Sequence, residues 1–194
     1  IDHIKDDVMH YSKGFTLAEL VVSLSILAIT LAIAAPSFGN LVKSNRATAL
    51  VNDLLTDLQL ARSEAIKLNQ TVTLCKSSDK LGCGGDWSDG WIVFSDSNRN
   101  RRIDGTDRLL VISDAIGGSL VLSWNAFRSD NYIQFSSQGY IHSNNGTFKI
   151  CPSDRDVRQA RALIINRIGR ARVSKDRNSD GIHEDARGRP LFCS

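Results

Sequence analysis

The longest apolar stretch of the chain lies near its N-terminus. Residues 15–38 include the uncharged run LVVSLSILAITLAIAA at positions 20–35, and a helix that spans a membrane needs about twenty apolar residues. We therefore expect residues 15–38 to form a transmembrane helix. The polar residues 1–14 that precede it are expected to be a leader, and a secretory signal cleaved after Ala35 is the competing interpretation.

Past Pro36 the pattern becomes amphipathic, which argues against cleavage at Ala35. Apolar residues recur at spacings of three and four, as in a helix with one buried face: Ala47, Val51, Leu54, Leu58, Ala61, Ala65 and Leu68. We expect residues 39–69 to continue the helix and to pack on a head.

After residue 69 the chain changes to short runs rich in β-branched and aromatic residues, which are typical of strands: 71–75, 91–94, 108–112, 120–124, 132–136 and 147–151. Gly, Asn, Asp and Ser separate these runs and favour hairpins over βαβ crossovers. We predict an α+β fold in which the long N-terminal helix is followed by an antiparallel β-rich, sandwich-like head over residues 70–194.

Composition and cysteine usage narrow the class of protein. The 194 residues carry a formal net charge of +3 and 23% charged residues, which excludes a disordered acidic or basic tail protein. No C-x-x-C pair is present, so we expect disulfides rather than a metal site, with three connectivities open. The four cysteines all follow the apolar segment, which suits an oxidising compartment: Cys75, Cys83, Cys151 and Cys193.

The start of the apolar helix resembles a known processing site. Gly14-Phe15-Thr16-Leu17-Ala18-Glu19 is similar to the cleavage and methylation site of type IV prepilins and of the pseudopilins of type II secretion. The resemblance implies that a prepilin peptidase cuts after Gly14 and methylates Phe15, and that the helix is retained. It also implies that Glu19 pairs with the N-terminal amine of a neighbouring pilin subunit. On chemistry alone, the alternative is a carboxylate that snorkels to the membrane interface.

A second resemblance covers most of the remaining chain. The segment LQLARSEAIKLNQTVTLCKS at residues 58–77, with Gly90-Trp91 and Phe94-Ser95-Asp96, is similar to the FimT and GspH group of minor pilins. The resemblance implies a single pass through the inner membrane and a periplasmic head, followed by assembly into an extracellular pilus or a periplasmic pseudopilus. It also implies that Cys75 pairs with Cys83 and Cys151 with Cys193, although two other pairings remain open.

Basic residues are concentrated at positions 155–175. This segment holds seven basic residues against the single acid Asp156, which is an electrostatic footprint for a polyanion: Arg155, Arg158, Arg161, Arg167, Arg170, Arg172 and Lys175. Within it, Gly169-Arg170-Ala171-Arg172 matches the GRxR motif of the FimT branch, and this resemblance implies DNA binding in natural transformation.

We expect residues 162–173 to form a hairpin that turns near Gly169. Arg170 and Arg172 then lie on one face about 6.6 Å apart, which suits neighbouring phosphates. Arg167, Lys175 and Arg161 are expected to form the surrounding positive field, and phosphate contacts of this kind are not sequence-specific. The competing interpretation is a charged edge strand that prevents aggregation.

Two oxygen-rich segments partly imitate calcium loops. Asp176, Asn178 and Asp180 occupy positions one, three and five of such a loop, but position twelve is Arg187 where a glutamate is needed. The segment 96–100 is a weaker copy crowded by arginines. Since turns select Asp and Asn for local reasons, we expect no metal cofactor. Calcium at residues 176–180, with Glu184 or Asp185 in place of the missing glutamate, is the competing interpretation.

No motif of an enzyme is present. The sequence lacks H-E-x-x-H, G-x-S-x-G and the Walker glycine loop. His3 and His10 lie in the expected leader, and His142 and His183 are expected to be isolated surface residues. We therefore expect a non-enzymatic protein.

Two functions remain open. One is a minor type IV pilin that binds DNA, and the other is a structural minor pseudopilin of a type II secretion system. The basic segment 155–175 distinguishes them, because a purely structural subunit has no need of concentrated arginine.

We predict that the mature chain begins at Phe15 and keeps its hydrophobic helix, because the peptidase site lies before this helix rather than after it. Mass spectrometry of the membrane-bound protein measures the N-terminus directly. A chain that begins after Ala35, or one that still carries Ile1, would contradict the assignment to the pilins.

Overall fold

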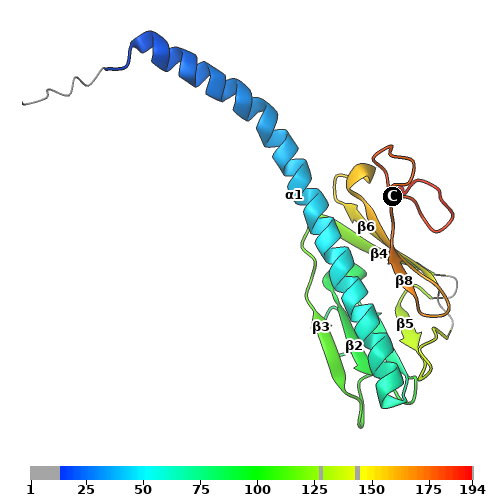
Figure 1. The fold of residues 1–194 in the computed structure, drawn as a ribbon. Coiled ribbons are helices and arrows are strands. Elements are labelled where there is room, and N and C mark those ends of the chain that lie inside the picture. The colour runs from blue at the N-terminus through cyan, green and yellow to red at the C-terminus, as the bar shows by residue number, and fades with distance from the viewer. Residues whose placement is uncertain (1–13, 127–128, 143–144, 194) are drawn as a thin grey trace, which may run out of the picture. The chain divides into compact units, whose positions relative to one another are not determined.

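The computed structural model describes residues 14–126, 129–142 and 145–193. The chain divides into two compact units, residues 1–39 and 40–194. Helix α1 (Leu17–Leu68) begins in the first unit and ends in the second (Figure 1). The expected leader, apart from Gly14, lies outside the described residues.

In the first unit, α1 exposes apolar side chains on every side. Leu17, Leu24 and Ile29 are all more than half exposed, and by length and composition the helix is suited to cross a membrane. A helix that is apolar all round is stable in lipid or inside a larger protein, because water disfavours so much apolar surface.

The head contains two four-stranded sheets among the described residues. The first has the order β3-β2-β1-β5, with bounds β1 (Val72–Lys76), β2 (Trp91–Ser95), β3 (Leu109–Ser113) and β5 (Tyr132–Phe135). The second has the order β4-β6-β7-β8, with bounds β4 (Leu120–Ala126), β6 (Gly146–Pro152), β7 (Arg161–Ile165) and β8 (Ala171–Val173). All neighbouring strands are antiparallel. The predicted α+β fold with an antiparallel head is confirmed.

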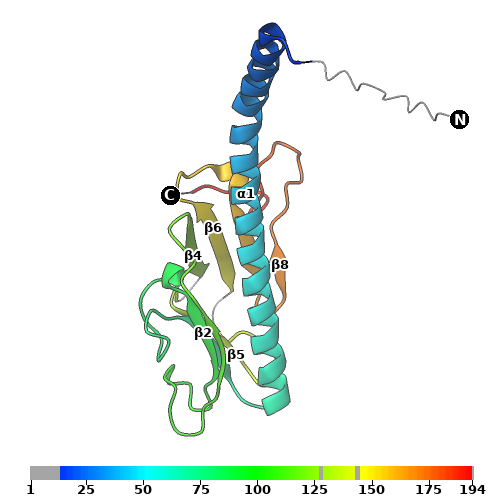
Figure 2. The same ribbon diagram turned by 90° about the vertical axis from the view of Figure 1, so that its left-hand side faces the viewer.

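The amphipathic stripe of α1 forms a single core with both sheets. Val51, Leu54 and Leu58 are buried together with Leu74 of β1 and Phe148 of β6. Figure 2 shows the head portion of α1 running along both sheets. The spacing of three and four in the sequence therefore identified the buried face of the helix correctly.

The C-terminal tail is fixed to the second sheet. The structure joins Cys151 of β6 to Cys193, and Cys75 to Cys83, which is the pairing that the family resemblance implies. Leu191 is buried against Ala162 of β7. The tail (red in Figure 1) therefore lies beside the second sheet.

Leu58→Ala is expected to lower the free energy of unfolding by about 2–5 kcal/mol, because it leaves a cavity in the shared core. Leu58 is 2% exposed, whereas Leu60, on the same helix, is 37% exposed. Leu60→Ala is therefore the matched control and should change stability by less than about 0.5 kcal/mol. Urea unfolding of the detergent-solubilised chain, followed by tryptophan fluorescence, measures both. Equal losses would contradict the assignment of the core face.

Candidate nucleic-acid interface

The predicted basic hairpin is present and turns between β7 and β8. Gly169 N donates to Asn166 O at 3.0 Å, and Asn166 N donates to Arg170 O at 3.1 Å. The Asn166 side chain adds an acceptor for Arg170 N at 2.9 Å. These bonds form a tight turn followed by a glycine in the left-handed region, a common hairpin geometry. We call residues 166–175 the basic hairpin.

Gly169 determines how closely the hairpin packs on the head. Its φ is 77°, and a Cβ atom here would lie 2.4 Å from the carbonyl oxygen of Gly139. The same oxygen accepts a hydrogen bond from Nε of Arg62 on α1 at 3.1 Å. Only glycine permits this approach without strain. Gly169 is itself buried, so its part in any DNA site is conformational.

The strand register places Arg172 on the outer face of the second sheet. Arg172 is paired with Ile164, whereas the adjacent pair, Leu163 and Val173, contributes to the core. Paired residues share a face, and the faces alternate along a strand. Arg170 precedes Arg172 by two residues and is therefore on the same outer side, as the sequence predicted.

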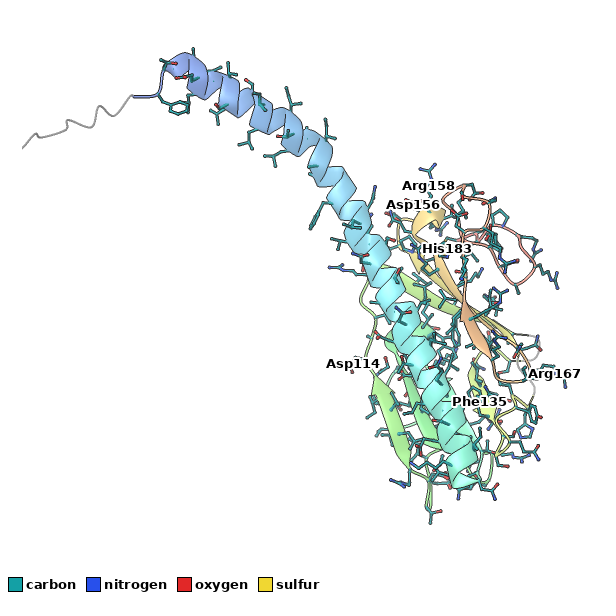
Figure 3. The ribbon with its side chains drawn as sticks, in the orientation of Figure 1. Asp114, Phe135, Asp156, Arg158, Arg167 and His183 are labelled. Carbon is teal, nitrogen blue, oxygen red and sulfur yellow. A yellow bond between two sulfur atoms is a disulfide. The ribbon has the colours of Figure 1, made fainter. Side chains whose placement is uncertain are left out.

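Four cations follow one another along the basic hairpin, from its turn to two residues past the end of β8. Arg167, Arg170 and Lys175 are exposed, and Arg172 is half-buried. Their side chains form no ion pair or hydrogen bond with another described residue. Arg167 lies at the rim of the head (Figure 3). From Arg170 to Lys175 the extended chain spans about 17 Å, with Arg170 and Arg172 on the outer face and Lys175 beyond the end of β8. A series of unpaired cations is suited to a polyanion.

Arg161 lies at the start of β7, a strand length from the turn but near the Lys175 end of the row, because Ser174 N donates to Ala162 O. Its guanidinium donates to the carbonyl oxygens of Ala160 (2.8 Å) and Arg158 (3.2 Å) and to Ser44 Oγ on α1 (2.8 Å). Burial lowers the pKa of Arg161. Arg161 therefore ties the second sheet to α1 through its hydrogen bonds and keeps its positive charge, and its part in the field expected around Arg170 stays a prediction.

The tail brings a further cation to the outer face. A hollow of about 410 Å³ lies between the second sheet and the tail, lined by Ile164, Asp185, Arg187 and Arg189 among others. Arg189 pairs with Asp185 at 2.8 Å, whereas the Arg187 side chain has no partner among the described residues. The sequence did not identify Arg187 as part of the basic surface, because its position depends on the path of the tail.

In the oxygen-rich segment at 176–180, the side-chain oxygens accept hydrogen bonds from nearby backbone N–H groups. The Asp176 carboxylate accepts from Ser179 N at 2.7 Å and from Gly181 N at 2.9 Å. Asp180 accepts from Ile182 N at 2.8 Å, and Asn178 donates to the Asp180 carboxylate at 2.9 Å. These bonds are the usual function of Asp and Asn in polar turns.

His183 is not the isolated surface residue that was expected. It is half-buried, and its Nδ1 lies 2.9 Å from Ser174 Oγ at the end of β8. Burial lowers the pKa of His183, and the charge of Arg161 adds to this effect. His183 therefore supports the packing of the tail on the hairpin.

Glu19 participates in a helix cap that the sequence analysis overlooked. Its carboxylate accepts from Thr16 N at 3.0 Å and from Thr16 Oγ1 at 2.9 Å, while Thr16 Oγ1 accepts from Glu19 N at 3.2 Å. Such reciprocal bonds are the capping box of a T-x-x-E sequence. The spacing of Thr16 and Glu19 alone was sufficient to predict it.

Comparison with family models gives two matches along the chain. Residues 50–169, more than half of the chain, match the model described as Type II transport protein GspH. Residues 9–35 match the Prokaryotic N-terminal methylation motif. The two matches correspond to the head with its helix and to the apolar N-terminal segment.

Comparison with individual proteins gives matches of low sequence identity or partial coverage. Pilin-like protein PilA1 of Thermus thermophilus is 35% identical over 94 residues, which cover 47% of this chain and 53% of that protein. The match thus spans about half the length of this relative. The crystal structure of the type IV minor pilin FimU of Pseudomonas aeruginosa has a TM-score of 0.53 at 22% identity, covering 68% of this chain and 90% of that one. At this identity the similarity shows a shared fold.

Gly169→Ala is expected to lower the free energy of unfolding by about 2–4 kcal/mol, because it combines backbone strain with a clash against Gly139 O. Gly188 has nearly the same φ, 78°, but nothing lies within 4 Å of a Cβ added there. Gly188→Ala therefore reports the backbone strain alone and should cost about 1 kcal/mol. Urea unfolding measures both values. A loss at Gly169 no larger than that at Gly188 would show that the close approach is unimportant.

Proposed function

This chain belongs to the GspH family of type IV pilin-like proteins, and we propose that it is a minor pilin that binds DNA through the basic hairpin, for DNA uptake in natural transformation. The observation that carries the proposal is the row formed by Arg167, Arg170, Arg172 and Lys175, whose head groups have no partner among the described residues. Residues 166–175 contain no acidic residue to neutralise them.

The chemistry of the row suits phosphate rather than bases. An arginine guanidinium binds a phosphate through two parallel hydrogen bonds, which a lysine ammonium does not. Phosphates follow each other every 3.4 Å along the axis of one DNA strand, so a row of about 17 Å faces about five of them. We propose binding that is independent of sequence, because such contacts carry no base information.

The rest of the chain serves assembly in this proposal. The apolar part of α1 anchors the protein in the inner membrane until a prepilin peptidase has processed it, and then packs with other pilin subunits. Nothing in this role requires catalysis, and we propose that the protein is not an enzyme.

A structural minor pseudopilin of a type II secretion system is the second candidate. The observation that favours it is that β8 is an edge strand of the second sheet. Charged side chains on an edge strand prevent sheets from pairing with one another. This function gives the arginines a purely protective role and predicts no affinity for DNA.

Replacement of Arg170 and Arg172 by glutamine distinguishes the two functions. The double variant should bind mixed-sequence duplex at least tenfold more weakly at moderate salt, because two phosphate contacts are lost. The slope of log affinity against log salt should fall by about two units. Fluorescence anisotropy with the full chain in detergent measures both quantities.

Arg155→Gln with Arg158→Gln is the matched control. It removes the same charge from the same segment but at the other end of β7, where Figure 3 shows Arg158 far from Arg167. Its DNA affinity should stay within about twofold of the parent. If both double variants lose affinity equally, the effect is one of net charge. If neither does, the structural pseudopilin is the better assignment.

A further inference from the structure

The loop between β2 and β3 has the residue spacing of a calcium loop over its full length. An EF-hand loop supplies oxygen ligands from positions 1, 3, 5, 7, 9 and 12, the seventh through its backbone carbonyl. Counted from Asp96, these positions are Asp96, Asn98, Asn100, Arg102, Asp104 and Asp107. Residues 96–100 alone are a poorer copy of a calcium loop than residues 176–180, because half of the ligand positions follow residue 100.

The side chains at these positions turn towards one another. Asn98 Nδ2 lies 3.3 Å from Asp104 Oδ1, and Asn100 Nδ2 contacts Asp104 Oδ2. The described residues contain no group of three or more His, Cys, Asp or Glu arranged for a metal, so this loop relies on amides as well as carboxylates. The Asn98 and Asn100 oxygens accept from Asn100 N at 3.1 Å and from Arg102 N at 2.8 Å. Rotation of either amide exchanges its nitrogen for its oxygen and presents a ligand at the cost of one of these bonds.

The carboxylate of Asp96 has one oxygen without a partner. Asp96 is fully buried. Its Oδ2 accepts from Thr73 Oγ1 (2.7 Å), Gln134 Nε2 (2.9 Å) and Arg101 N (3.1 Å). Its Oδ1 has no hydrogen-bond partner among the described residues. A buried carboxylate oxygen requires a compensating interaction. Since Oδ2 accepts from the backbone of Arg101, the sixth residue of the loop, the carboxylate lies against the loop, and Oδ1 is left for a further interaction such as a cation.

The backbone supports the same assignment. EF-hand loops place glycine at position six for a sharp turn. Arg101 makes that turn here with a φ of 64°. Ile103, at position eight, packs against Ile92 and Phe94. The loop is therefore anchored to the first sheet on one side and open to solvent at Asn98, Asn100 and Asp104.

The arginines of the loop do not occupy its interior. Nε of Arg99 donates to Thr71 Oγ1 at 3.2 Å. The Arg101 guanidinium lies over the Tyr132 ring, 5.0 Å from its centroid. Arg102 lines a hollow that Asn100 and Gly84 also line. The side chains of Arg99 and Arg101 are therefore held by contacts outside the proposed set of ligands.

We propose that residues 96–107 bind one calcium ion, with Asp96 Oδ1, the side chains of Asp104 and Asp107, the two amide oxygens and the Arg102 carbonyl as ligands. Calcium accepts six to eight oxygens in flexible geometry, including carbonyls, whereas magnesium demands a stricter octahedron. The ion would tie the β2–β3 loop to β1 through Thr73 and to β5 through Gln134. We expect a calcium affinity like that of calcium-binding modules in extracellular proteins, with a Kd of about 10⁻⁴–10⁻³ M.

Calorimetric titration of the chelator-treated full chain in detergent with calcium chloride tests the proposal. One site per chain is expected, and 10 mM calcium should raise the melting temperature of the head by about 5 °C. Magnesium chloride at equal ionic strength should give no comparable shift. No heat and no shift with calcium, or an equal shift with magnesium, would overturn the assignment.

Three variants locate the site. Asp104→Ala should weaken calcium binding at least tenfold. Asn100→Asp adds a charged ligand and should tighten binding about tenfold, an outcome that no loss of folding can imitate. Asp180→Ala, in the other oxygen-rich segment, is the matched control and should bind as the parent does. If Asp180→Ala loses calcium binding and Asp104→Ala does not, the calcium site is at residues 176–180 and the proposal is wrong. Unchanged calcium affinity in Asn100→Asp would also refute the proposed set of ligands.

Discussion

The head depends on one apolar stripe along α1. Its residues are buried together with residues of both sheets in a single core, and within the described residues no strand of one sheet pairs with a strand of the other. Each sheet has an apolar face that must be covered, and a helix packed across both is a stable solution to that constraint. The stripe is therefore the surface on which both sheets are held, and every feature at the edge of the head takes its position from it.

The basic hairpin shows how this positioning is transmitted. Arg62 of α1 donates to Gly139 O, and Gly169 packs directly on the same oxygen. The hairpin is thus fixed to the helix through a turn of the first sheet. Arg161, at the other end of β7, binds Ser44 of α1. One contact therefore holds the turn of the basic hairpin and the other holds the start of β7, so that α1 supports both ends of the strand that precedes the cations.

Charged side chains of the head occur in two opposite environments, exposed at the surface or buried among polar groups. The cations of the basic hairpin lie at the surface and have no side-chain partner in the described part of the chain, which costs little free energy there and leaves them available to a ligand. Asp96, in contrast, is buried among Thr73, Gln134 and the backbone of Arg101, where a charge is expensive unless it is satisfied. One arrangement attracts a large polyanion from solution. The other is suited to a small cation that becomes part of the structure.

The sequence by itself determined the elements: the helix, the strands and the basic hairpin follow from periodicity and turn residues, which act between near neighbours. Only the tertiary structure decided which charged residues remain available. Arg161 and Arg170 belong to the same basic segment, yet Arg161 is bound by a residue 117 positions away, and Arg170 has no side-chain partner among the described residues. Asp96 and Asp176 begin similar segments, yet only Asp96 is buried by distant strands with one oxygen unpaired. The physical reason is that burial and pairing depend on contacts between distant residues, which local patterns do not encode.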